Sequence, residues 1–341
     1  MKLVSHHLGL AAALGLSLST AAAADPIADF YKGKQINWIL SAGAGGGYSS
    51  YAHVFAPYFS AHIPGKPNIV VQNMPGAGGI RAMIYLANVA PKDGSTLGLV
   101  HSSVPYAPLY GIRGANFDPL KMNWIGSINA ATGICVSWTA SGVTTWQDLF
   151  DKELIVGGHA GVDPELTPRL YNAVLGTKFK IINGYNGTAD IALAMERGEV
   201  FGIGDWSWSS LKKQKPDWIR DKKITLLLQS GLRNHPELPN VPNALAFAKT
   251  QSDRNILELF FTQKTVARPF IAPPGVPAQR LALLRSAFAA LATDRDFLAD
   301  AEKSNLEVEP LSGEEVDKIV ALITSAPPGV AERYSKAFAT P

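Results

Sequence analysis

The chain has 341 residues, of which 47% are hydrophobic and 17% are charged, with a formal net charge of +3. This is enough apolar material for two domains with buried cores, and the Lys and Arg residues are scattered rather than gathered into a basic stripe that would bind nucleic acid. The single cysteine, Cys135, excludes an intramolecular disulfide and multi-cysteine metal clusters.

The first residues predict a secretory signal peptide. Lys2 precedes an apolar run from Leu8 to Ala24, and four alanines end this run just before Asp25. A short run with small residues at its end favours cleavage over a transmembrane anchor. We therefore expect residues 1–24 to be removed and the mature chain to be soluble in the periplasm.

Short β-branched apolar runs alternate with helical segments along the chain. The predicted strands are Ile36–Leu40, Asn68–Gln72, Thr96–Val100, Ile134–Trp138, Leu154–Val156, Lys180–Ile182 and Ile224–Gln229. The predicted helices are Tyr51–His62, Ile80–Val89, Pro164–Leu175, Ala189–Arg197, Gln279–Leu291 and one from about Gly313. This alternation predicts α/β lobes with mostly parallel sheets.

The C-terminal part predicts a return to the first lobe. Arg268–Pro277 is rich in proline and is expected to be a stiff connector, and Leu306–Pro310 a short edge strand. No glycine-loop strand follows it that would build a third domain. We expect two α/β lobes, in which residues 25–130 plus 266–341 form lobe 1 and residues 131–265 form lobe 2.

Four loops rich in glycine or turn residues directly follow predicted strands. They are Ser41–Ser50, Asn73–Gly79, Gly157–Asp163 and Asn183–Asp190. In open α/β sheets, ligands bind at such carboxyl ends of strands. The glycines of the first two loops let the backbone approach a ligand, and the N–H groups at the start of the following helix favour an anion. We expect the first of these helices to begin near Ser49 or Ser50; an ordinary tight turn is the alternative.

Cofactor and catalytic motifs do not fit. The dinucleotide pattern G-x-G-x-x-G fails because Tyr48 and Ser50 stand where glycine is needed, and a P-loop lysine is absent. The sequence has no G-x-S-x-G elbow and no H-E-x-x-H helix. We predict no cofactor, no metal and no enzymatic activity, although a dispersed Ser-His-Asp triad stays open.

Several motifs, in this order and spacing, resemble the substrate-binding receptors of tripartite tricarboxylate transporters. They are Gly45–Gly47, Pro75–Gly79, Ala90–Leu97, Tyr185–Gly187, His235–Pro242 and Ala272–Pro277. The resemblance implies a two-lobed periplasmic binding protein with a hinge between the lobes, which closes on a small carboxylate and holds it by backbone N–H groups of the first two loops. The family usually carries Asp two residues after the glycine run, where this chain has Ser49, which argues against an amino-acid ligand.

The loops and the resemblance together predict the binding site. The expected ligand-binding residues are Ser41, Gly43, Gly45, Gly46, Gly47, Tyr48, Ser49, Gly76, Ala77, Gly78, His101, Ser102, His159, Gly161, Tyr185, Thr188, Asp205 and Trp206. Tyr48, Tyr185, Trp206 and Trp208 favour a ligand with an apolar or aromatic body, although both tryptophans also fit core positions.

The expected function is capture of a small organic carboxylate and its delivery to an inner-membrane tripartite tricarboxylate-type transporter. The expected partners are the ligand and the transporter subunits, and we expect a monomer that binds no nucleic acid. A periplasmic α/β hydrolase and a ligand-sensing receptor for a membrane kinase are the alternatives.

Overall fold

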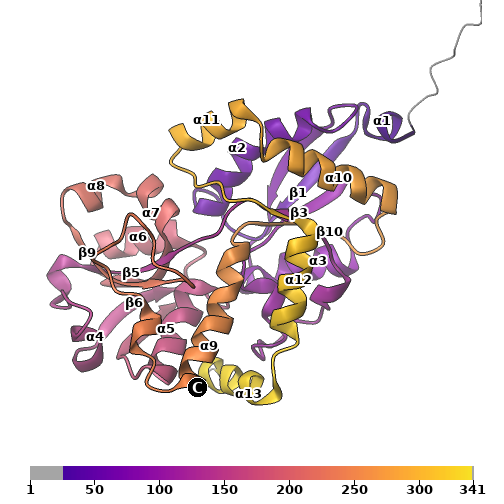
Figure 1. The fold of residues 1–341 in the computed structure, drawn as a ribbon. Coiled ribbons are helices and arrows are strands. Elements are labelled where there is room, and N and C mark those ends of the chain that lie inside the picture. Colours follow the sequence, from indigo (N-terminus) through magenta and orange to yellow (C-terminus); the bar gives the residue numbers. More distant parts are fainter. Residues whose placement is uncertain (1–25, 340–341) are drawn as a thin grey trace, which may run out of the picture.

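The computed structural model describes residues 26–339, which fold into two α/β lobes, each built on one sheet (Figure 1). The predicted signal peptide lies outside the described residues. No helix within residues 26–339 is long and apolar enough to cross a membrane.

The first lobe contains a sheet with the strand order β11-β4-β10-β3-β1-β2. Its strands are β1 (Gln35–Leu40), β2 (Asn68–Asn73), β3 (Thr96–Leu99), β4 (Asn123–Ser127), β10 (Pro269–Ala272) and β11 (Leu311–Ser312). β1 is parallel to β2 and β3, whereas β10 runs antiparallel to both of its neighbours, β3 and β4.

The second lobe contains a sheet with the strand order β7-β6-β8-β5-β9. Its strands are β5 (Gly133–Trp138), β6 (Leu154–Gly158), β7 (Phe179–Asn183), β8 (Gly202–Ser207) and β9 (Ile224–Ser230). β6 is parallel to β7 and β8, whereas β5 is antiparallel to β8 and β9. The α/β class is confirmed, but both sheets are mixed, because β10 and β5, by which the chain enters each sheet from the other lobe, run against their neighbours.

Helices connect and cover the strands. The α-helices are α1 (Pro26–Tyr31), α2 (Gly47–Ala61), α3 (Ile80–Asn88), α4 (Asp148–Asp151), α5 (Asp163–Val174), α6 (Thr188–Glu196), α7 (Trp208–Gln214), α8 (Pro216–Arg220), α9 (Gln251–Thr262), α10 (Ala278–Leu291), α11 (Arg295–Lys303), α12 (Gly313–Thr324) and α13 (Pro328–Phe338). Short 3-10 turns occupy Ala77–Gly79, Val104–Tyr106, Pro119–Lys121, Thr139–Ser141, Ala244–Phe247 and Gln263–Val266.

The chain crosses between the lobes through two adjacent segments, 128–132 and 264–268. The N–H of Ala131 donates to the carbonyl of Lys264 at 2.8 Å, and the N–H of Ala267 donates to the carbonyl of Asn129 at 3.1 Å. The two segments therefore form an antiparallel ribbon, which is the hinge. The predicted connector Arg268–Pro277 is wrong in part, because its residues Pro269–Ala272 form β10 in the middle of the first sheet.

The sequence could not reveal β10 because its burial comes from distant partners. Pro269 begins the strand, a position where the missing N–H is tolerated. The ring of Phe270 then packs against Phe55 of α2 and Trp38 of β1, with ring centroids 4.3 and 4.9 Å away. This aromatic cluster is the core of the first lobe, and it fixes α2 against the sheet.

The C-terminal segment differs from the prediction in one detail. The edge strand is Leu311–Ser312 rather than Leu306–Pro310, since Pro310 has no N–H to donate and Leu306 is buried in the core. Ser312 then caps α12 by a reciprocal capping box with Glu315.

The last helix, α13, packs beside α9 (Figure 1), and its Arg333 pairs with Asp253 of that helix at 2.6 Å. A helix near the C-terminus thus touches the segment assigned to lobe 2. The boundaries at residues 130 and 266 stay a prediction.

Candidate functional site

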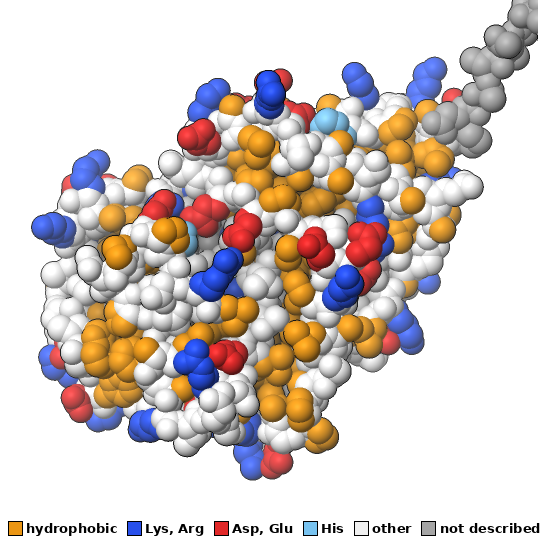
Figure 2. Space-filling model, viewed as in Figure 1, with side chains coloured by type: hydrophobic (Ala, Val, Ile, Leu, Met, Phe, Trp, Pro, Cys, Tyr) orange, Lys and Arg blue, Asp and Glu red, His pale blue; other side chains and the backbone are white. Residues whose placement is uncertain are grey.

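A cavity of about 340 Å³ lies between the two lobes, beside the hinge. Its walls come from the loop before α2, the turn after β3, the starts of α5 and α6, the end of β8 and the hinge residues Lys264, Ala267 and Arg268. A volume in this range suits a small organic molecule. Over the face shown in Figure 2, acidic and basic side chains are interspersed, so no single-sign field dominates that face.

The cavity brings together many of the predicted site residues. Those that line it are Gly43, Gly46, Gly47, Tyr48, His101, Ser102, His159, Thr188, Asp205 and Trp206. Those that lie outside its lining are Ser41, Gly45, Ser49, Gly76, Ala77, Gly78, Gly161 and Tyr185. From the second predicted loop, only Pro75 reaches the cavity.

The second loop instead meets the opposite lobe at the rim. A Cβ placed on Gly78 would lie 1.9 Å from the carbonyl oxygen of Ala160, and one placed on Gly43 would lie 3.7 Å from that of Asn186. The Ser103 hydroxyl also donates to the Gly161 carbonyl at 3.4 Å. The rims of the two lobes therefore touch, and the molecule is in a closed arrangement.

The helix after the first glycine-rich loop, α2, begins earlier than expected. α2 starts at Gly47, with Gly46 as its N-cap and without a side-chain cap, whereas Ser49 or Ser50 was predicted. A Cβ on Gly47 would lie 2.1 Å from the Ser210 hydroxyl and 3.3 Å from Nη2 of Arg268, so only glycine allows this approach. The uncapped N–H groups of the first turn and the helix dipole favour an anion at this end.

Arg268 also lies at the N-terminus of α2, and it lacks a counter-charge. The residue is 3% exposed, and its guanidinium donates to the Ala267 carbonyl at 2.9 Å and to the Ser210 hydroxyl at 3.3 Å. It lies over the rings of Tyr48 and Tyr51, at 4.1 and 4.8 Å from their centroids. Its buried Nε has no hydrogen-bond partner, and no carboxylate within residues 26–339 pairs with it. A buried charge in this state lacks the partner that buried charges need.

Lys264, the other cation that lines the cavity, is already paired with two carboxylates of the protein. Its ammonium lies 3.0 Å from a carboxylate oxygen of Asp163 and 2.8 Å from one of Asp205. Burial alone would lower the pKa of Lys264, but the two carboxylates outweigh burial and raise it. Burial raises the pKa of Asp205, and the Lys264 charge opposes that shift. Hydroxyls of Thr167 and Ser230 also donate to Asp205.

Two histidines face each other across the cavity. The rings of His101 and His159 lie edge to face, with centroids 5.3 Å apart. Burial lowers the pKa of both, and the His101 pKa is lowered further by His159 and Arg268. Both imidazoles are therefore neutral at neutral pH. The Ser41 hydroxyl lies 2.9 Å from His101 Nδ1, but it also accepts a hydrogen bond from the backbone N–H of His101 at 3.0 Å and lies fully buried outside the cavity lining.

Most of the aromatic rings that the sequence singled out have partners in the protein. Trp206 and Trp208 are buried in the core of the second lobe, where Trp206 packs against Trp218 at 6.2 Å and the Trp208 indole donates to Glu237 at 2.6 Å. Tyr185 packs against the same core. The Tyr48 ring lies between Arg268 and His101. An aromatic ligand body stays a prediction, with fewer free rings than expected.

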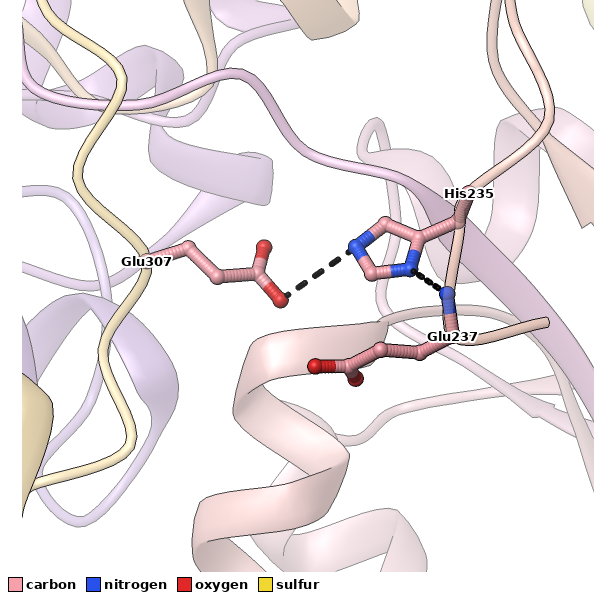
Figure 3. Close-up of side chains that lie close together, drawn as sticks. All are labelled: His235, Glu237 and Glu307. Atoms are coloured by element: carbon pink, nitrogen blue, oxygen red, sulfur yellow. Dashed lines mark hydrogen bonds and ion pairs between the residues drawn. The ribbon is translucent and has the colours of Figure 1, made fainter.

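A second polar cluster joins the lobes outside the cavity (Figure 3). His235 lies 3.6 Å from Glu307. The Lys212 ammonium, which the figure does not draw, lies 3.3 Å from Glu307 and 2.6 Å from Glu237. We call Lys212, His235, Glu237 and Glu307 the interlobe bridge. The His and Glu ligand atoms are close enough for a metal ion, but the Lys212 ammonium already supplies the positive charge between the carboxylates.

Sequence reasoning predicted Asp205 but missed the other charged residues of the site. Arg268, Lys264 and Asp163 were not among the expected ligand-binding residues, and neither was Ser210. One local signal was present: Arg268 interrupts the apolar run from Val266 to Ala272, and a charge within such a run marks a buried, functional position. Lys264 carried no comparable signal.

Comparisons with known proteins identify a distant relative and solved structures that share this fold. No family model matches the chain. The UPF0065 protein in gbd 5'region of Cupriavidus necator is 28% identical over 240 residues, which cover 68% of each chain. The periplasmic binding protein BugD aligns with a TM-score of 0.73 at 20% identity, over 90% of this chain and 98% of that chain. MatC from Rhodopseudomonas palustris with bound malate aligns with a TM-score of 0.67 at 16% identity, over 90% and 99%.

The chain thus has the two-lobed fold of periplasmic binding proteins, closed around a cavity at the hinge. This is the fold that the resemblance to the substrate-binding receptors of tripartite tricarboxylate transporters implies, and the solved structures confirm it, among them a TctC solute binding protein from Polaromonas with a TM-score of 0.59 at 19% identity over 90% of this chain and 99% of that chain.

Proposed function

We propose that this chain is a periplasmic receptor that captures a small organic carboxylate between its lobes and delivers it to an inner-membrane tripartite tricarboxylate-type transporter. The observation that carries the proposal is Arg268, a buried guanidinium without a carboxylate partner, beside the uncapped N-terminus of α2. A ligand carboxylate supplies the missing counter-charge and accepts hydrogen bonds from both groups.

The hinge supplies the second part of the function. Arg268 belongs to the hinge ribbon, Ser210 to the second lobe and Gly47 to the first, and the three meet at one wall of the cavity. A carboxylate at this wall therefore contacts both lobes at once. Because a ligand that binds the closed state better shifts the population toward it, capture and closure are one event.

The hydrolase alternative receives less support. Ser41 and His101 form the one Ser–His contact that adjoins the cavity among the described residues, and Ser41 holds a backbone N–H there rather than facing the cavity. The placement favours a structural role for this pair, which fixes the turn that carries His101.

Calorimetric titration with matched acids and amides tests the proposal. Straight-chain acids from propanoate to octanoate are titrated beside the amides of the same length, which keep the shape and lose the charge. We expect at least one acid to bind and its amide to bind at least roughly tenfold more weakly, as expected for a charge-assisted hydrogen bond. Equal binding of acid and amide throughout would refute the carboxylate anchor.

Variants of the anchor sharpen the test. Arg268→Gln removes the charge and is expected to abolish acid binding, whereas Arg268→Lys keeps a charge and is expected to retain weaker binding. Thermal unfolding of both variants without ligand controls for loss of the fold. Loss of acid uptake in cells that lack the chain, with the transporter genes intact, tests delivery.

A further inference from the structure

A ligand with two carboxylates would need two free positive charges in the cavity, and the charged residues of the lining do not supply them. The charged residues of the lining are Asp163, Asp190, Asp205, Lys264 and Arg268. Lys264 is held between Asp163 and Asp205, both within 3.0 Å. Among the described residues, Arg268 is therefore the one cavity-lining cation that has no carboxylate partner in the protein.

The part of the lining around Lys264 is acidic. Asp163 and Asp205 together exceed the single charge of Lys264 when both are ionised, and they balance it when buried Asp205 is protonated. Neither state leaves a positive charge free. Asp190 also lines the cavity, but it lies at the exposed rim, where it accepts the N–H of Asn186 at 3.2 Å and its charge acts weakly on the ligand.

The histidines do not change this balance at neutral pH. His101 and His159 are buried and face each other, and burial holds the pKa of both below the usual range. A second ligand carboxylate beside Asp163 and Asp205 would lose its water and find carboxylates and neutral rings instead of an unpaired cation, which is the unfavourable case for a buried charge.

We propose that the ligand carries a single carboxylate, which pairs with Arg268, and that the rest of the ligand bears no second anionic group. The inference rests on the proposed function and narrows its ligand class to monocarboxylates. Lys264 with Asp163 and Asp205 is the device that excludes dicarboxylates, because it holds the second cation of the cavity in internal pairs.

The test is a titration of the wild-type chain with pairs of acids that differ by one carboxylate. Each acid from propanoate to octanoate is compared with the dicarboxylate of the same chain length, for example hexanoate with adipate. We expect the best monocarboxylate to bind at least roughly tenfold more tightly than its dicarboxylate, the loss expected for one unpaired charged hydrogen-bonding group.

A variant that frees the second cation supplies the complementary test. Asp163→Asn keeps the side-chain shape and releases part of the Lys264 charge, so the affinity for adipate relative to hexanoate is expected to rise roughly tenfold. Asp190→Asn is the matched control, because it removes an acidic group of the lining that does not pair with Lys264. It is expected to change the ratio by less than about threefold, since an exposed charge acts weakly.

The outcomes separate the two proposals. Dicarboxylates that bind as tightly as their monocarboxylate partners, or tighter, would overturn the single-carboxylate inference and leave the receptor function standing. An unchanged ratio in Asp163→Asn with wild-type folding would overturn the role of Lys264. If no acid of either series binds the folded chain, the proposed function fails and the inference fails with it.

Discussion

The rim contact at Gly78 should control closure without touching the ligand. Gly78 has φ of +64°, and a Cβ on it would lie 1.9 Å from the Ala160 oxygen, where real Cβ contacts keep at least 3.0 Å. The opposing loop, which meets the new Cβ with backbone atoms, would have to retreat by about 1.1 Å. Gly78→Ala should therefore prevent the lobes from meeting, although Gly78 does not line the cavity.

Gly78→Ala should have two effects. The first is backbone strain, which alanine also brings at other glycine positions with a left-handed backbone. The second is the clash with Ala160, which is specific to Gly78. A left-handed backbone costs a non-glycine residue about 1–2 kcal/mol. Gly161→Ala on the opposite rim is the matched control, because its φ is +79° and its nearest neighbours would be 3.8 Å from the new Cβ. Both variants should lose about 1–2 kcal/mol of unfolding free energy without ligand.

Only Gly78→Ala should also lose affinity for the best acid, by at least roughly tenfold if the closed state becomes about 1.4 kcal/mol less favourable. Calorimetry measures the affinity, and small-angle X-ray scattering measures the ligand-induced decrease in radius of gyration. Equal affinities and equal compaction in the two variants would show that the rim contact has no part in closure.

The remaining predictions concern stability. Because burial lowers the pKa of His101 and His159, the unfolded chain takes up protons below about pH 6.5 while the folded chain does not. The contribution of the histidines to the free energy of unfolding is then fully present above that pH and falls below it by about 1.4 kcal/mol per pH unit for each histidine, until the folded pKa is reached. Urea unfolding at several pH values should show a smaller fall in His101→Gln than in the wild type. An equal fall would contradict this. Lys264→Met leaves Asp163 and Asp205 without their cation and should cost about 3–5 kcal/mol in urea unfolding; a loss below about 1 kcal/mol would mean that the pairs contribute little. Glu307→Gln breaks the interlobe bridge at part-exposed side chains, so thermal unfolding should change by no more than about 1 kcal/mol and the difference should vanish in high salt; a larger, salt-independent loss would show a different role.

Local patterns predicted the elements that depend on local burial. β1 and its neighbours β2 and β3 are short apolar runs between turns, and all three lie where the sequence placed them. β10 was taken for a connector because proline dominates its surroundings, and only β3 and β4, which are distant in the chain, make it a strand. The start of α2 was misjudged because its N-cap is Gly46, which has no side chain to cap the helix, and not a capping serine.

The site divides in the same way. Glycines after strands indicated the cleft, since the topology of parallel strands places their ends together. The sequence could not distinguish a glycine that lines the cavity, such as Gly47, from one that lets the rims meet, such as Gly78. Arg268 contacts Ser210, and Lys264 pairs with Asp163 and Asp205, all of which are distant in the chain. The sequence could not predict these contacts because the fold brings the residues together at the hinge.

The central claim is that a ligand carboxylate pairs with Arg268 and supplies its missing counter-charge. A crystal structure of the chain with the tightest-binding acid of the titration series tests it directly. We predict that the carboxylate lies within hydrogen-bond distance of the Arg268 guanidinium, at the N-terminus of α2, with the lobes closed. A carboxylate bound elsewhere in the cavity, with Arg268 still unpaired, would contradict the account.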